Sequence, residues 1–405
     1  MNENIEIKPL PYLRIFLVIF LAVNLTGIIN FPFFSEILEN TKLYILCFLG
    51  FIGFLIGTLF TRTIKIKFKS NIKGRFKPKV IFVLFVLINT FSFCLIILTH
   101  YLNGGILILS ATKRFGTFAI TNVIVYTSII ISLIFFAERL LANKKFKIKY
   151  IIFIITQALF IISLGYRSPL IILVGGTVIL FFVIRNDFQN RYKNIFTKKN
   201  LIGLLVVVML MSYISSFRVS LKYSLTRYYK NMDITYFEDK PVLKQFIPTL
   251  ALFRFDQQMV KTIIEKTENK PYYLGLAFSN FKTLLPGSQL GVRNIVGEIV
   301  GARKMPNGKP WSITPTLQGA LFIDGGYFLV FFGFLLIAFL IEYIKKIMKE
   351  KKDPFSLTLY ALFTINTLMC IHTGYFDLTF YIMLIIIALI KIMTYRINFS
   401  LKGFK

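Results

Sequence analysis

Residues 217–315 decide how the rest of the chain is arranged, because they separate two strongly apolar parts of the sequence. The stretch begins FRVSLKYSLTRYYK (217–230), continues through ALFRFDQQMVKTIIEKTENK (251–270) and ends KPWSITP (309–315). It mixes Arg, Lys, carboxylates and aromatic residues, whereas runs of Ile, Leu, Val and Phe dominate on either side. We therefore expect a polar loop between two sets of membrane-spanning helices.

The composition is that of a polytopic membrane protein: of the 405 residues, 56% are hydrophobic and 45 are Phe. In a soluble protein the formal net charge of +30 would indicate nucleic-acid binding, but here the charge must first be assigned to the two sides of a membrane. The three cysteines lie in apolar runs without CxxC spacing, so we expect no disulfide framework and no metal. We likewise expect no cofactor and no nucleic-acid partner.

Apolar runs compatible with a hydrocarbon core of about 30 Å recur along the chain. They lie near residues 10–30, 43–60, 80–99, 118–137, 150–164, 169–184, 201–217, 317–341, 355–371 and 378–392. The predicted fold is therefore all-α, with about ten transmembrane helices. It divides into an N-terminal seven-helix part (1–216), a large loop (217–315) and a C-terminal three-helix part (316–405). We expect one integrated domain, because no internal repeat or low-complexity linker separates these parts.

The connections between the runs alternate in charge, and this predicts the topology. The connections at 61–79, 138–149, 185–200 and 342–354, together with the C-terminal tail, are dense in Lys and Arg and are expected in the cytoplasm. Both termini then face the cytoplasm, and the loop 217–315 is extracytoplasmic. Within the loop, apolar residues at helical spacing and punctuating prolines predict one or two amphipathic helices near the outer surface.

Basic residues on the predicted outer face are candidates for binding an anion. A guanidinium stays charged, and its planar fork of donors matches phosphate oxygens, which favours a phosphate or diphosphate ligand. Arg167 lies in the connection LGYRSP between two short spans, where we expect it in a protein-lined cavity. Arg218 and Lys222 share a face if the preceding span continues as a helix, whereas Arg227 would point the opposite way.

Two histidines and a few carboxylates complete the outer candidates. His100 and His372 are each predicted at the outer end of a span, where a histidine is either a base or a hydrogen-bonded interfacial residue. Asp256 is one of several alternative carboxylates. Asp324 lies where the chain returns to an apolar run, LFIDGG, so its carboxylate needs a partner, for which an arginine of the loop would serve.

No soluble-enzyme motif such as a P-loop, GxGxxG, HExxH or GxSxG is present. Instead, the connection GYRS (165–168) and the succession RFDQ, PYYLGLAF, LLPG, KP and ITPTLQGALFIDGGYF resemble the bacterial oligosaccharide repeat-unit polymerases, the Wzy-type polymerases of O-antigen and capsule. The resemblance covers mainly residues 160–335. Where many members have Pro followed by Arg, this chain has Pro286 followed by Gly287, and Arg293 is close enough to substitute.

The resemblance implies a glycosyltransferase-C-like enzyme of the inner membrane that acts, without metal, on undecaprenyl-diphosphate-linked oligosaccharides at the outer face. Because the departing diphosphate needs charge stabilisation, we expect Arg167 and Arg254 to be catalytic residues that clamp it. We expect His372 or a carboxylate of the outer face to orient or deprotonate the acceptor hydroxyl. Four further residues are expected to bind the diphosphate: Arg218, Lys222, Arg227 and Arg293. Membrane lipid, a chain-length regulator and a flippase are further expected partners.

Two other functions fit the same features. An O-antigen ligase has a similar topology and a similar arginine-dependent outer site but transfers the chain to another acceptor. A lipid-linked oligosaccharide flippase would also be polytopic and basic, although transporters usually contain repeats and bind their substrates near the midplane. The sparse polar residues of the spans are better explained as contacts between helices. These residues are Asn24, Asn89, Gln157 and Asn366.

Overall fold

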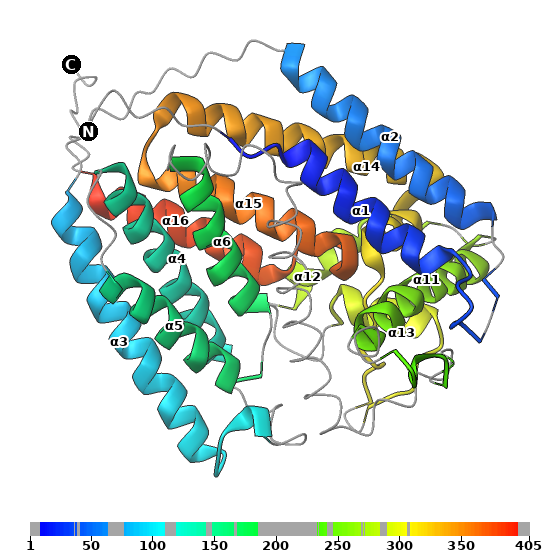
Figure 1. Ribbon diagram of the computed structural model, residues 1–405, viewed down its shortest axis with the longest axis horizontal. Helices are drawn as coiled ribbons and strands as arrows, with labels where there is room; N and C mark the ends of the chain where they lie inside the picture. The colour runs from blue at the N-terminus through cyan, green and yellow to red at the C-terminus, as the bar shows by residue number, and fades with distance from the viewer. Residues whose placement is uncertain are drawn as a thin grey trace, which may run out of the picture.

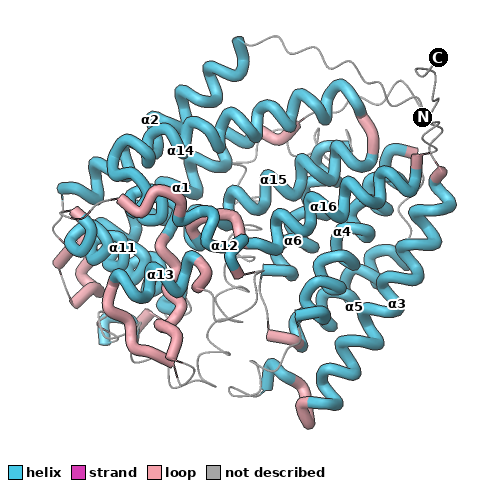
Figure 2. Tube along the Cα trace, turned by 180° about the vertical axis from the view of Figure 1, so that it is seen from behind, coloured by secondary structure: helices cyan, strands magenta, loops and turns pink. Residues whose placement is uncertain are grey.

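The computed structural model consists of helices joined by turns and loops, with no strand within the residues that it describes (Figure 1, Figure 2). The described residues are 9–35, 37, 38, 41–63, 77–109, 119–142, 148–165, 168–184, 233, 235–240, 246–268, 270, 272–283, 290–305 and 308–395. The predicted all-α class is therefore confirmed for these ranges.

The helices follow the three parts of the sequence. The described residues of the N-terminal part form α1 (Tyr12–Ile28), α2 (Thr41–Thr63), α3 (Pro78–Leu102), α4 (Ala119–Leu141), α5 (Ile148–Ser163) and α6 (Ser168–Ile184). Those of the loop form α11 (Ile247–Thr267), α12 (Ser279–Lys282) and α13 (Val292–Ile299). The C-terminal part forms α14 (Thr316–Lys351), α15 (Pro354–Thr373) and α16 (Leu378–Thr394). Short 3-10 turns are η1 (Leu107–Leu109), η3 (Thr235–Phe237) and η4 (Leu276–Phe278).

Five of the described helices are long and apolar enough to cross a membrane: α2, α3, α4, α14 and α15. Four more, α1, α5, α6 and α16, are apolar and 16 or 17 residues long, which corresponds to about 24–26 Å at 1.5 Å per residue. These helices coincide with nine of the ten predicted runs, and the tenth, 201–217, lies outside the described residues. The chain is therefore an integral membrane protein, whereas ten spans stay a prediction.

Local sequence signals fix the hairpin between α14 and α15. Lys352 follows α14 in the left-handed conformation, with φ of 46°. The Asp353 carboxylate accepts hydrogen bonds from the backbone N–H groups of Phe355 and Ser356, both at 2.8 Å. The Ser356 hydroxyl accepts the Asp353 N–H at 3.3 Å, which completes a capping box, and Pro354 occupies the first turn.

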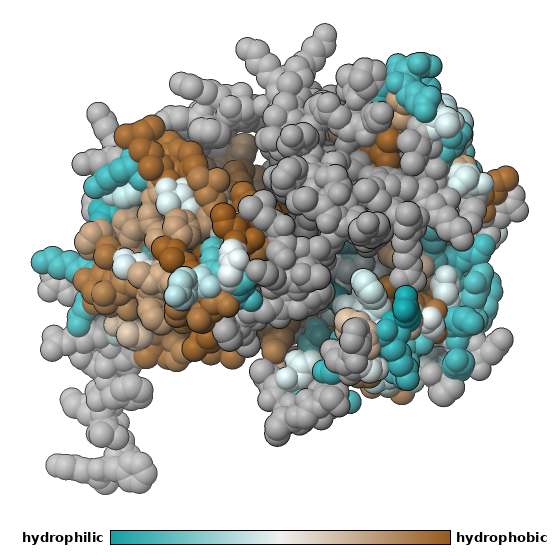
Figure 3. All heavy atoms as spheres, turned by 90° about the horizontal axis from the view of Figure 1, so that it is seen from below, coloured by the Kyte–Doolittle hydropathy of each residue, from teal (hydrophilic) through white to brown (hydrophobic). Residues whose placement is uncertain are grey.

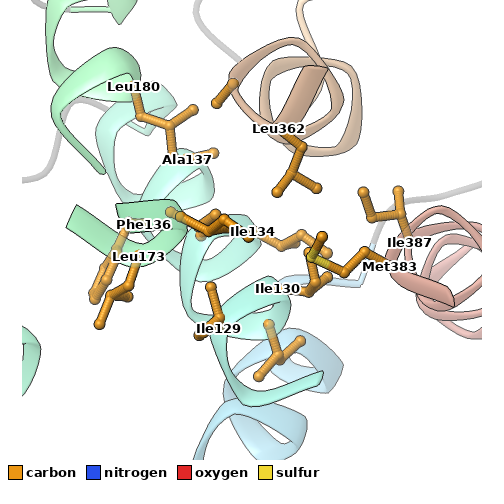
Figure 4. Packing of buried hydrophobic residues seen from close by; sticks show 14 of the residues in the cluster. Ile129, Ile130, Ile134, Phe136, Ala137, Leu173, Leu180, Leu362, Met383 and Ile387 are labelled. Atoms are coloured by element: carbon orange, nitrogen blue, oxygen red, sulfur yellow. The ribbon is translucent and has the colours of Figure 1, made fainter. Parts of the chain in front are cut away.

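Two large hydrophobic cores hold the described helices together, beside a smaller cluster of Phe34, Phe237, Ile247 and Ala251. The first contains residues of α3, α4, α5, α6, α15 and α16. Figure 4 shows part of it, including Ile134, Leu173, Leu362 and Met383. The second joins α1, α2 and α14 with the loop helices α11 and α13. Neither core belongs to one part of the sequence alone, because the C-terminal helices contribute to both and the loop packs into the second.

Buried polar side chains link the helices within these cores. The Gln157 amide donates to Asn89 Oδ1 at 3.0 Å, which joins α5 to α3, and Gln257 donates to Asn24 Oδ1 at 2.9 Å, which joins α11 to α1. The predicted role in contacts between helices is confirmed for Asn24, Asn89 and Gln157. Asn366 differs, because its amide donates to a carbonyl oxygen four residues earlier in its own helix.

Glycines on one face of α2 bring it close to the backbone of α14, and the two helices lie side by side in both views (Figure 1, Figure 2). A Cβ added at Gly53 would lie 2.4 Å from the carbonyl oxygen of Phe331, and one added at Gly57 would lie 2.3 Å from that of Leu335. Small residues allow such close packing in a membrane, where burial of apolar surface does not by itself drive helices together.

Replacement of Gly57 by Val should separate α2 from α14, because the backbone oxygen opposite it cannot move aside. We expect a lower thermal unfolding midpoint in detergent, equivalent to a loss of about 1–3 kcal/mol. Ile56→Val, on the same helix but with an exposed side chain, is the control and should change the midpoint little. An unchanged midpoint for Gly57→Val would contradict the close packing.

Candidate functional site

Helix α11 brings the loop into contact with the spanning helices. Residues three or four positions apart along it are buried: Ala251, Arg254, Gln257, Val260, Ile263 and Ile264. This face packs against α1 and α14, and Gly27 of α1 and Gly319 of α14 leave room for it. The amphipathic helix predicted from the sequence is therefore present, and its buried face is covered by protein.

Arg254 closes the C-terminal end of α1 and is only 1% exposed. Its Nη1 donates to the carbonyl oxygens of Gly27 at 2.9 Å and Ile28 at 3.3 Å, and its Nη2 donates to Asn30 Oδ1 at 2.7 Å. The guanidinium also lies 4.5 Å from the ring centroid of Phe34. The last carbonyls of a helix have no partner within it and favour a cation. This position fits the capping of α1 and does not present Arg254 to a lipid diphosphate.

Asp256 and His372 form a pair that joins α11 to the end of α15. Oδ2 of Asp256, which is fully buried, lies 2.6 Å from Nδ1 of His372, whose side chain remains 34% exposed. Burial raises the pKa of the Asp256 carboxyl, and the His372 imidazole opposes that shift. When Nδ1–H donates to the carboxylate, Nε2 of the neutral ring is unprotonated and can accept a proton. A carboxylate that orients a histidine in this way prepares it to act as a base.

His100, the other histidine, has both ring nitrogens engaged. Its Nδ1 accepts the backbone N–H of Leu107 at 3.4 Å, and its Nε2 lies 2.7 Å from the hydroxyl of Ser163. An accepting Nδ1 leaves the proton of the neutral ring on Nε2, which then donates to Ser163. We therefore assign His100 to the contact between α3, η1 and α5, one of the two alternatives that the sequence left open.

Asp324 anchors the turn ahead of η4. Its Oδ1 accepts the backbone N–H groups of Gly275 at 2.9 Å and Leu276 at 2.7 Å, and its Oδ2 accepts the hydroxyl of Tyr375 at 2.6 Å. The expected arginine partner was wrong, because three neutral donors already satisfy the carboxylate. Directly after it, α14 is kinked at Gly326, whose φ of 60° favours glycine.

Arg293 of α13 forms an ion pair with Asp377, the residue ahead of α16. Its Nη2 lies 3.1 Å and 2.8 Å from the two carboxylate oxygens. The side chains are 33% and 42% exposed. In the structure Arg293 fixes α13 to the segment that follows His372. Its expected binding of a diphosphate stays a prediction.

The other predicted site residues lie outside the described residues, so their roles stay predictions. They are Arg167, Arg218, Lys222 and Arg227. Among the residues that the structure describes, no group of three or more His, Cys, Asp or Glu side chains is arranged to hold a metal ion.

The pairing of Asp256 with His372, 116 residues later, could not be inferred from spacing. The sequence contained only a weak signal. Arg254, Asp256 and Gln257 interrupt the apolar residues of a predicted helix, and polar groups on or beside a buried face need partners. The signal indicates that partners exist, but not which residues they are.

The fold and the site define an all-α integral membrane protein in which a loop helix holds a buried carboxylate against a histidine at the end of a spanning helix. Residues 250–384 match the model of a family described as "Putative O-antigen polymerase". The match covers about a third of the chain, includes both Asp256 and His372, and confirms the resemblance to the repeat-unit polymerases. No curated protein and no solved structure gives a significant match.

Asp256→Asn should change the pH dependence of stability. Because the pKa of Asp256 is raised in the folded protein, the carboxyl group stabilises the fold while it is protonated, and this contribution is lost as the pH rises through the folded-state pKa. We expect the unfolding midpoint of the variant, relative to the unaltered protein, to increase as the pH rises above about 4, the ordinary pKa of an aspartate. Thermal unfolding in detergent checks this. Glu265→Gln, exposed on the same helix, is the control, and a relative midpoint that falls over this range would contradict the prediction.

Arg254→Ala should destabilise the protein by about 3 kcal/mol or more, because it leaves buried carbonyl oxygens and Asn30 without their charged donor. The thermal unfolding midpoint measures this, with the exposed Arg303→Ala as the control. A variant with full stability but no activity would contradict the capping role and would point to contact with the substrate.

Proposed function

We propose that the protein polymerises undecaprenyl-diphosphate-linked oligosaccharide repeat units into a surface polysaccharide at the outer face of the inner membrane. The family match supports a polysaccharide polymerase, and the apolar helices support its place in a membrane. The lipid-linked substrate follows from the resemblance, and the outer face follows from the charge of the connections. In this proposal both termini are cytoplasmic, and α11 to α13 are extracytoplasmic.

The Asp256–His372 pair is the observation that best supports this chemistry. As the acceptor hydroxyl oxygen attacks the anomeric carbon of the growing chain, the hydroxyl loses its proton, and the bond from that carbon to the diphosphate oxygen breaks. We assign Nε2 of His372 as the base that takes the proton. Asp256 holds the ring through Nδ1–H and stabilises the imidazolium that forms.

The departing diphosphate needs positive charge near it. The residues that we propose for this role are Arg167, Arg218, Lys222, Arg227 and Arg293. Arg254 has a different role in this scheme, because it fixes the end of α1 to α11, the helix that also holds Asp256. We therefore propose Arg254 as a positioning residue for the histidine–carboxylate pair.

His372→Gln should reduce polymer formation about 10²- to 10⁴-fold, the usual contribution of a general base. The assay incubates the purified protein in nanodiscs with lipid-diphosphate-linked repeat units extracted from its own host and separates the products on a gel. His100→Gln is the matched control and should keep most of the activity, because His100 bonds only within the fold. A full ladder of products from His372→Gln would exclude His372 as the base.

The same assay tests the proposed function itself. A ladder of multiples of the repeat unit, formed by the unaltered protein, is the expected result. If the repeat units remain single although every component of the assay is known to be active, the result would contradict a polymerase. It would favour a ligase or a flippase.

A further inference from the structure

A cavity of about 540 Å³ lies within the loop, between the end of α11, the η4–α12 segment and α13. Its apolar lining includes Leu290 and Ile295, and its polar lining comprises Lys270, Tyr273, Lys282 and Glu298. Seen from below, hydrophilic residues gather on the side of the molecule where α11 and α13 lie (Figure 3). Sites for small ligands typically have volumes of about 300–1,000 Å³ and combine apolar walls with a few polar groups. The cavity has these properties.

The charged groups of the cavity, Lys270, Lys282 and Glu298, form no ion pair with any part of the chain that the structure describes. Two ammonium groups and one carboxylate leave a net positive charge, which favours a ligand with one negative charge. The same groups can donate to and accept from hydroxyls, and the half-exposed ring of Tyr273 offers an apolar face.

The wall of the cavity that contains Tyr273 is connected through Asp324 to Tyr375, in the segment between α15 and α16. The backbone N–H of Tyr273 donates to the carbonyl oxygen of Ile323 at 3.0 Å. The backbone N–H groups of Gly275 and Leu276 donate to Asp324, which also accepts the hydroxyl of Tyr375. The position of Tyr273 is thus coupled to that of Tyr375.

A second wall, α13, is connected to the segment between α15 and α16 by the Arg293–Asp377 ion pair. Tyr375 and Asp377 follow His372 closely in the chain. Both walls are therefore attached to the residues directly after the proposed base. A ligand held between these walls has a fixed register relative to His372.

We propose that this cavity binds an acidic sugar residue of the glycan that the protein extends. The sugar carboxylate binds Lys270 and Lys282, its hydroxyls bond to Glu298, and its ring packs on Tyr273. This inference rests on the proposed function, because a glycan is the ligand only if the protein acts on one. The cavity then selects repeat units with a carboxylate at one position and holds them in register with the acceptor hydroxyl.

Binding can be measured without turnover. The full-length protein in nanodiscs is titrated with a free glucuronic-acid-containing disaccharide, with its carboxyl-reduced counterpart and with inorganic pyrophosphate, and each ligand is followed by NMR. We expect the acidic disaccharide to bind and the reduced one to bind about fivefold or more weakly. Lys270→Gln with Lys282→Gln should weaken binding of the acidic disaccharide about tenfold, since each exposed charge pair contributes a factor of up to about five. Glu298→Gln should strengthen it, because the like charge is removed while the hydrogen-bonding group remains.

Three control measurements separate this inference from its alternatives. Lys304→Gln, at an exposed lysine outside the cavity, and His372→Gln should both leave binding of the disaccharide unchanged. If His372→Gln abolishes polymerisation but keeps binding of the disaccharide, the cavity is distinct from the proposed reaction centre. If the double lysine variant weakens the binding of pyrophosphate and the disaccharide does not bind at all, the inference is overturned. The cavity would then be assigned to the lipid diphosphate. Binding of neither ligand, or binding that the lysine variants leave unchanged, would also overturn it.

Discussion

The buried polar face of α11 is the constraint on which the rest of the structure depends. A helix that buries Arg254 and Asp256 in a protein core needs a partner for each side chain, because an unpaired buried charge is costly. Arg254 finds its acceptors at the end of α1, and Asp256 finds its donor at the end of α15. One loop helix therefore fixes the ends of two spanning helices that are remote in sequence. It also places His372, whose side chain is about a third exposed, against the fully buried carboxylate of Asp256.

The last turn of α15 and the segment after it receive a contact from each of three elements. His372 binds Asp256 of α11, Tyr375 binds Asp324 of α14, and Asp377 binds Arg293 of α13. The loop is thus attached to the spanning helices at several points over a few residues. This arrangement explains how a mainly polar stretch between apolar runs forms a definite site, since each contact limits the freedom left for the others. The family match, 250–384, extends from α11 to α16 and includes the residues of all three contacts.

Some features of the site followed from residue chemistry, and others did not. The sequence correctly predicted that Asp324 needs a partner, because an ionised carboxylate cannot remain unpaired in an apolar segment. It did not predict that the partners are backbone N–H groups and a tyrosine, since that depends on a turn 48 or 49 residues away. Arg254 was expected at a diphosphate because arginine suits phosphate oxygens. The carbonyls at a helix end suit it equally well, and only the packing of α11 on α1 decides between them.

The sequence by itself determined the all-α class, the apolar helices and the helical loop segment. Hydrophobic run length and spacing depend on local composition, which requires no knowledge of distant residues. The tertiary structure alone decided which histidine faces a carboxylate, which cations are buried, and which loop segments enclose a cavity. His100 and His372 occupy equivalent places in the sequence pattern, at the outer ends of predicted spans. They differ in their hydrogen-bond partners, because those partners are set by contacts between segments far apart in the chain.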